Sequence, residues 1–148
     1  MRNSKELNQI GKNAYAAILE MVETLQKADD DATNTYVKDG ADVADAYEKA
    51  REAAREAIEQ DPLSIEVRAG WWSLGEGDPD NTPEEYRILL GTGGPAVRIV
   101  GELGAHGEPS SATLQVQDWG TPWTDYRKAD DAILMAYVGV FAFDAYQY

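Results

Sequence analysis

The residue types that most often carry out catalysis are scarce in this chain of 148 residues. It contains one histidine, His106, and no cysteine. His106 stands between Ala105 and Gly107 in a turn-rich segment, where we expect no second group to hold and orient a general base. Without an oriented histidine or a thiol, mechanisms that pair a nucleophile with such a base lose a required member. We therefore expect a protein that is not an enzyme and has no catalytic residue.

Carboxylates are plentiful, and two short segments bring several of them close together in sequence. Residues 29–31 are three consecutive aspartates, and residues 78–80, Asp-Pro-Asp, resemble the start of a calcium-binding loop. An EF-hand loop needs a glycine at its sixth position and a bidentate glutamate at its twelfth, but these positions are Pro83 and Leu89 here. Adjacent aspartates in a loop more often form a solvated cluster of charge. We therefore expect no metal site and no cofactor.

The segment from Gly91 to Gly94, Gly-Thr-Gly-Gly, does not match a phosphate-binding loop despite its glycines. It lacks the Lys-Ser/Thr pair of such loops. It also leads into an apolar run with the period of a strand, whereas a phosphate loop leads into a helix whose N-terminus binds the anion. We interpret it as the turn of a β-hairpin, in which glycine permits a positive φ.

The net charge limits the classes of partner. The chain has 27 acidic and 13 basic side chains, a formal net charge of −14, and both residues 1–61 and residues 62–148 are acidic. Such a surface repels nucleic acid and anionic membranes, and it attracts basic proteins over one Debye length, roughly 8–10 Å at physiological salt. We expect neither direct nucleic-acid binding nor membrane binding. Two interpretations stay open: the charge serves solubility alone, or the acidic surface is itself the binding surface.

Two amphipathic helices are expected in the first 60 residues. Apolar residues recur at three- and four-residue steps over residues 4–26, with Asn3 as the N-cap. The polar run 28–35 ends that pattern, so we expect a loop or a frayed helix end there. A second helix is expected over residues 42–60, with an alanine-rich inner face suited to close packing. The two helices are expected to form an antiparallel hairpin.

The remainder of the chain has the pattern of short strands followed by one helix. Pro62 stops the second helix, because the residue before a proline is disfavoured in the helical conformation. The period of the apolar residues then changes to two. The expected elements are strands over residues 63–72, 85–90, 96–103 and 112–119, and a helix that starts at Asp130 or Asp131.

This order of elements predicts an α+β fold in a single domain, residues 1–148. Residues 1–60 form the helical hairpin, and residues 61–148 form a four-stranded antiparallel β-sheet, a meander, with the C-terminal helix packed on it. The residues expected on the inner face of the last three strands are Tyr86, Ile88 and Leu90, then Val97, Ile99 and Gly101 or their neighbours, then Leu114 and Val116.

Four tryptophans lie at or near the ends of expected strands. Trp71 and Trp72 end the first strand, Trp119 ends the fourth, and Trp123 precedes the final helix. If the first and fourth strands are close neighbours, these indoles converge at one end of the sheet. They would then form either an aromatic pocket or partner-binding anchor, or a core corner that covers the end of the sheet.

Several motifs resemble those of a family of small acidic proteins from bacteriophages and prophages. They are DPLSIEVR at residues 61–68, EYRILLGTGGPAVRI at 85–99, QDW at 117–119 and TPWT at 121–124. The resemblance covers about residues 57–148. It implies a phage-encoded accessory protein of the anti-CRISPR or wider anti-defence type. Such proteins are typically small, non-enzymatic and acidic, and some imitate the phosphate charge of nucleic acid; the resemblance implies no catalytic residue.

We therefore expect a non-enzymatic inhibitor that covers a basic nucleic-acid-binding surface of a CRISPR-Cas effector by DNA mimicry. The N-terminal sequence has no apolar run of the length of a signal peptide or membrane span, so the expected location is the host bacterial cytoplasm. The oligomeric state and the identity of the partner stay open. The candidate partner-binding residues are Asp29, Asp30, Asp31, Glu48, Glu52, Glu56, Glu59, Glu76, Asp78, Asp80 and Glu84.

The alternative function belongs to another class. In it, the protein binds a small ligand or a nucleotide signal in an aromatic pocket. The candidate residues of that pocket are Trp71, Trp72, Trp119 and Trp123.

Overall fold

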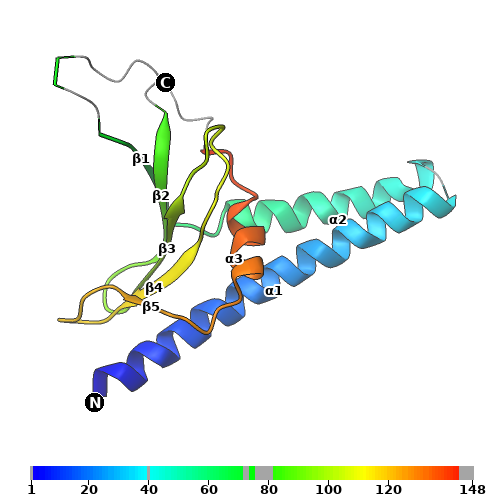
Figure 1. Cartoon of the computed structure of the whole chain (residues 1–148). Coiled ribbons are helices and arrows are strands. Elements are labelled where there is room, and N and C mark those ends of the chain that lie inside the picture. Colours follow the sequence, from blue (N-terminus) through cyan, green and yellow to red (C-terminus); the bar gives the residue numbers. More distant parts are fainter. Residues whose placement is uncertain (1, 40, 72–73, 76–81, 144–148) are drawn as a thin grey trace.

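The chain folds into an antiparallel β-sheet with helices on one of its faces. The computed structural model describes residues 2–39, 41–71, 74–75 and 82–143 (Figure 1). The predicted α+β class is confirmed, but the sheet has five strands rather than four and the first helix is longer than predicted. The helices are α1 (Arg2–Asp39), α2 (Ala41–Glu59) and α3 (Asp131–Val138). The strands are β1 (Ser64–Ala69), β2 (Pro83–Gly91), β3 (Ala96–Glu102), β4 (Thr113–Gln117) and β5 (Thr124–Asp125).

Helix α1 runs without interruption from Arg2 to Asp39, so the predicted loop or frayed end at residues 28–35 is wrong. Ala32 is buried in the part of α1 that lies alongside α2 (Figure 1). Lys27 forms an ion pair with Asp31 one turn further on, with 2.7 Å between Nζ and Oδ2. Because packing of one helix face outweighs the weak helix propensity of aspartate, the three carboxylates stand on a helix.

The five strands form a meander in the order β1-β2-β3-β4-β5, and every neighbouring pair is antiparallel. Gly93 and Gly107, in the turns that join β2 to β3 and β3 to β4, have φ of 92° and 79°, as expected for hairpin glycines. The unpredicted strand β5 consists of Thr124 and Asp125, which pair with β4. Two residues are too few to show a period in sequence, so only the pairing reveals this strand.

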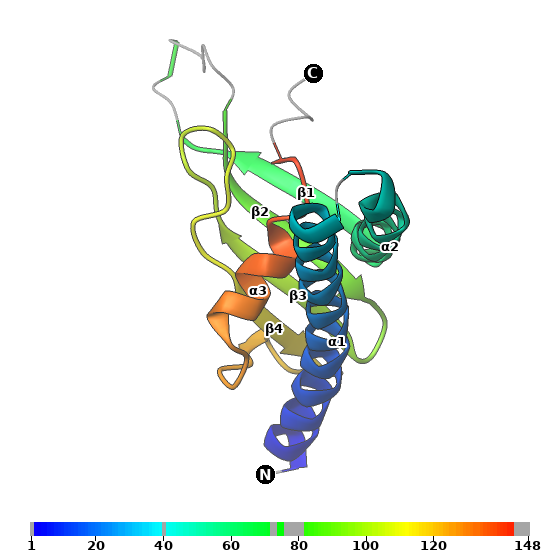
Figure 2. The same ribbon diagram turned by 90° about the vertical axis from the view of Figure 1, so that its right-hand side faces the viewer.

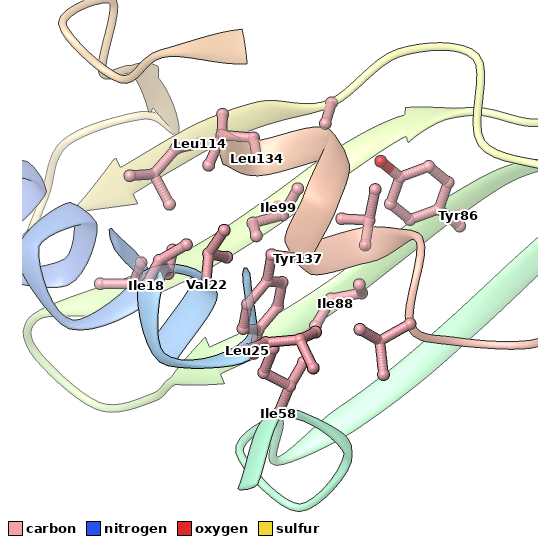
Figure 3. Close-up of a cluster of buried hydrophobic side chains, with 14 of the residues drawn as sticks. Ile18, Val22, Leu25, Ile58, Tyr86, Ile88, Ile99, Leu114, Leu134 and Tyr137 are labelled. Carbon is pink, nitrogen blue, oxygen red and sulfur yellow. The ribbon is translucent and has the colours of Figure 1, made fainter. Parts of the chain in front are cut away.

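The core lies between the sheet and α1, α2 and α3 (Figures 2 and 3). Ile88, Ile99 and Leu114 are cross-strand neighbours on the covered face, and all three are fully buried. Ile18 and Val22 of α1 belong to the same cluster (Figure 3). Six of the eight predicted inner-face residues are buried, namely Tyr86, Ile88, Val97, Ile99, Leu114 and Val116, whereas Leu90 and Gly101 are half-buried.

Hydrogen bonds from side chains stabilise helix α3 near both of its ends. The helix starts where the sequence predicts, and Asp130 caps it, with its Oδ1 accepting a hydrogen bond of 2.8 Å from the Ala132 N–H. Towards its end Tyr137 is buried, and its hydroxyl donates a hydrogen bond of 2.7 Å to Oδ2 of Asp61, just after α2. Burial, aided by the Asp61 carboxylate, raises the pKa of Tyr137 above its ordinary value of 10.0, and burial does the same for the pKa of Tyr86.

Gly11 lets the segment before α3 approach α1 closely. A Cβ atom at this position would overlap Cδ1 and Cγ of the Tyr126 ring. Tyr126 is itself buried, and its ring lies 6.5 Å from that of Tyr15, centre to centre. Glycine is unfavourable within a helix by about 1 kcal/mol relative to alanine. The close packing of the Tyr126 ring explains why position 11 is a glycine.

Replacing Gly11 by alanine is expected to destabilise the protein, although alanine favours the helix. The Tyr126 ring must move, and overpacking of this kind costs about 1–3 kcal/mol, more than the gain in helix propensity. Urea unfolding measures the difference. The control is Asn8→Ala on the exposed side of α1, expected to be neutral or slightly stabilising. An increase in stability for Gly11→Ala would contradict the close packing.

The buried tyrosines predict a loss of stability at alkaline pH. Because the folded state holds the phenolic protons of Tyr86 and Tyr137 to higher pH than the unfolded state, the stabilisation is complete below pH 10. It is lost as pH rises above that value, by up to about 1.4 kcal/mol per pH unit for each tyrosine.

Tyr137→Phe tests this dependence. It is expected to lower the free energy of unfolding by about 1–2 kcal/mol at neutral pH, because the bond to Asp61 is lost. It is also expected to flatten the decline above pH 10, as measured by denaturant titrations at several pH values. If the free energy of unfolding of Tyr137→Phe and of Tyr86→Phe declines above pH 10 as steeply as that of the wild type, the two tyrosines do not cause the decline.

Candidate functional site

Many of the acidic side chains lie on the helical hairpin. Residues 20–52, called the acidic arm below, contain ten acidic and four basic side chains, a net charge of −6. By contrast, residues 1–19 have a net charge of +2. The far ends of α1 and α2 extend beyond the sheet (Figure 1). The structure thus places a strongly acidic segment on a projecting helical hairpin.

Three of the side chains on the acidic arm meet across the two helices. Arg51 of α2 pairs with Glu48 one turn earlier, and its Nε lies 3.7 Å from Oδ1 of Asp29 on α1. Asp29 and Glu48 are half-buried. Exposed pairs of this kind contribute about 0.2–1 kcal/mol each. Their main effect is to fix the positions of these two carboxylates relative to each other.

The other predicted partner-binding residues are spread over the molecule. Asp30 and Glu52 are exposed on the acidic arm, whereas Glu56 and Glu59 are exposed on the part of α2 nearer the sheet. Glu84 lies on β2, apart from the hairpin. Glu76, Asp78 and Asp80 lie outside the described residues. The hairpin therefore unites Asp29, Asp30, Asp31, Glu48 and Glu52, but not Glu84.

The described tryptophans do not gather at one end of the sheet. Trp71 follows the end of β1 and Trp119 follows the end of β4, and these two strands run in opposite directions. Trp71 is fully exposed and Trp119 is 81% exposed. Trp119 lies against Gly94, in the turn between β2 and β3. A pocket shared by Trp71 and Trp119 is therefore not formed, and Trp72 lies outside the described residues.

Trp123 contacts a side chain on the face of the sheet that the helices leave uncovered. The guanidinium carbon of Arg98 lies 4.1 Å from the centre of the Trp123 ring. This distance is typical of a cation–π contact. The sequence marks Trp123 as a candidate site residue but not Arg98, because a single arginine in a strand with alternating polarity gives no signal of its own.

The uncovered face of the sheet is polar and largely paired. Arg87 on β2 binds both carboxylate oxygens of Glu66 on β1, with donor–acceptor distances of 2.9 and 3.2 Å. Arg68 pairs with Glu85 in the next cross-strand position. The Arg87 guanidinium lowers the pKa of the Glu66 carboxyl below its ordinary value, and Glu66 raises the pKa of Arg87 in turn. This face forms an open hollow of about 770 Å³.

His106 is exposed in the turn after β3, where the sequence places it. Its backbone N–H donates a hydrogen bond of 2.9 Å to Oε2 of Glu108. Among the described residues no three His, Cys, Asp or Glu side chains are grouped so that they could hold a metal ion. None of the described helices combines the length and apolar composition needed to cross a membrane.

Comparisons of this chain with protein-family models, curated proteins and solved structures gave no match.

The surroundings of the tryptophans predict different effects of removing them. Trp71→Ala is expected to change the free energy of unfolding by less than about 0.5 kcal/mol, because the side chain is fully exposed. Trp123→Ala removes the contact with Arg98 and is expected to destabilise by about 1 kcal/mol. Chemical denaturation followed by circular dichroism compares the two variants. The placement of the indoles is wrong if Trp71→Ala proves the more destabilising.

Proposed function

We propose that this protein is a non-enzymatic inhibitor of a host defence system, of the anti-CRISPR type. It binds a basic nucleic-acid-binding surface of a CRISPR-Cas effector through the acidic arm. The observation that carries the proposal is the net charge of −6 on residues 20–52, presented on a helical hairpin that extends beyond the sheet. Its phage context comes from the resemblance of the motifs in residues 57–148.

The helical support gives the carboxylates a regular spacing. Glu48, Glu52 and Glu56 follow one another at four-residue steps on α2, which corresponds to about 6 Å of rise per step. A site that binds DNA meets a backbone with one charge per ~1.7 Å of duplex axis. A row of carboxylates on a rigid helix offers such a site a comparable, if sparser, line of negative charge.

The fixed pairs on the arm support the same proposal. Arg51 is engaged by Asp29 and Glu48, so its positive charge is already partly balanced within the arm. Asp30 and Glu52 are exposed and have no ion-pair partner among the described residues, so they are available to cations of a partner. Complementary charge of this kind speeds association and selects partners more than it adds affinity.

The alternative function, ligand binding by the four tryptophans together, has less support. Trp71 and Trp119 lie at opposite ends of the sheet, so a ligand contacting both would have to span it. The charge of the arm, in contrast, is concentrated in one place.

Charge reversal on the arm tests the proposal. In binding assays with purified CRISPR-Cas effectors at about 50 mM salt, Asp30→Lys/Glu52→Lys is expected to weaken binding about tenfold or more, because attraction is replaced by repulsion. Raising the salt to about 500 mM is expected to weaken the wild type and reduce the difference between the two.

The matched control compares two single reversals. Glu52→Lys and Glu102→Lys change the net charge equally, and both glutamates are exposed, but Glu102 lies on β3 away from the arm. Only Glu52→Lys is expected to weaken binding markedly. Equal effects of the two would assign the attraction to net charge rather than to the arm. Binding insensitive to salt and to both reversals would refute charge mimicry.

A further inference from the structure

Arg98 is held in one orientation near the middle of the uncovered sheet face. Its Nε donates a hydrogen bond of 2.8 Å to Oε1 of Gln115, its cross-strand neighbour on β4. The flat guanidinium lies over the ring of Trp123, 4.1 Å from its centre. A hydrogen bond on one edge and an aromatic ring on one face fix the plane of the group.

Gln115 is itself oriented by a third residue. Its Nε2 donates a hydrogen bond of 2.9 Å to Oδ1 of Asp125 on β5. A carboxylate only accepts hydrogen bonds, so Asp125 selects the orientation in which the amide oxygen of Gln115 is directed at Arg98. The short strand β5 therefore positions Asp125, which orients Gln115, which in turn orients Arg98. Supporting contacts of this kind are typical of a preorganised binding site.

Arg98 differs from the other arginines of this face in lacking a carboxylate partner. Arg87 is paired with Glu66 and Arg68 with Glu85. No carboxylate of the described residues lies within ion-pair distance of Arg98, in a chain with 27 acidic side chains. Burial, and the nearby charge of Arg87, lower the pKa of Arg98 below its ordinary value. An anion placed here would relieve both effects.

The free edge of Arg98 borders the hollow of about 770 Å³ on this face. Val100 and Thr113 line the part of the hollow next to Arg98, and Arg87 borders it on β2. Glu85 and Glu102 line the other end, and Glu102 lies four residues beyond Arg98 on β3, a rise of about 13 Å. Glu66 and Arg68 also line the hollow, paired with Arg87 and Glu85, so Arg98 at one end and Glu102 at the other are the charges of this lining without an ion-pair partner among the described residues.

We propose that this hollow binds a small organic anion whose carboxylate or phosphate oxygens accept hydrogen bonds from the Arg98 guanidinium. The planar fork of arginine matches a pair of such oxygens. Arg87 adds a second positive charge, largely balanced by Glu66, so the site suits a single negative charge. Arg68 balances Glu85 in the same way, so Glu102 is the charge that disfavours a second anionic group, and the rest of the ligand is neutral or cationic. This site does not depend on the acidic arm.

The test is a titration followed by NMR, with benzoate as the carboxylate probe and dimethyl phosphate as the phosphate probe. The signals observed are the Nε–H of Arg98 and the indole N–H of Trp123. We expect saturable shifts of both signals with at least one probe, at millimolar concentration. A response to one probe alone identifies which oxyanion the site prefers.

Three variants connect the binding to Arg98. Arg98→Gln is expected to weaken binding about tenfold or more, and Arg98→Lys, which keeps the charge but loses the fork, to weaken it several-fold. The control Arg55→Gln removes one positive charge at an exposed position of α2, outside the hollow, and is expected to stay within about twofold of the wild type. Spectra of each variant without ligand show whether the fold is kept; if Arg98→Gln is misfolded, Arg98→Lys carries the test.

Two results would overturn the proposal. One is the absence of a saturable shift at Arg98 and Trp123 with both probes up to about 50 mM, well above the expected dissociation constant. The other is binding by folded Arg98 variants that is as tight as that of the wild type, which would place the anion elsewhere. The acidic arm contributes no residue to the hollow. A failure of the effector-binding test would therefore leave this proposal standing, and a failure of this test would leave the proposed function standing.

Discussion

The fold depends on the apolar packing of one long helix against two different partners. Near its middle, Ile18 and Val22 of α1 are buried with Ile99 and Leu114 of the sheet (Figure 3). Full burial of side chains of this size contributes about 1.5–3 kcal/mol each. Further along the same helix, Ala32 is buried in the part that lies alongside α2. Because one continuous helix joins the core to the arm, the core fixes where the arm projects.

This arrangement separates the charged surfaces from the packing that supports them. On the hairpin the buried positions are apolar, such as Leu25, Ala32 and Ala54, whereas carboxylates such as Asp30 and Glu52 are exposed to solvent. The many like charges repel one another, and that repulsion opposes a compact state. Burial of the apolar stripe, together with the contacts of Arg51, offsets it.

The sheet divides its residues between two environments by simple alternation. The covered face buries residues such as Ile88 and Ile99, whereas the opposite face carries cross-strand pairs such as Glu66 with Arg87. An antiparallel sheet commonly has one solvated face, so this polarity alone implies no function. What distinguishes Arg98 is the combination of a fixed orientation and the lack of a carboxylate partner, within a face where the other arginines are paired.

The sequence by itself determined the α+β class, most strand positions, most inward-facing strand residues and the region where the last helix starts, because each rests on a local pattern. Tertiary structure decided the rest. The helix continues through residues 29–31 because α2 packs beside it, which no window of sequence records. Strand β5, the separation of Trp71 from Trp119 and the support of Arg98 all follow from pairing between distant segments. Contacts of this kind are set by register and strand direction, whereas periodicity reports only which residues are buried.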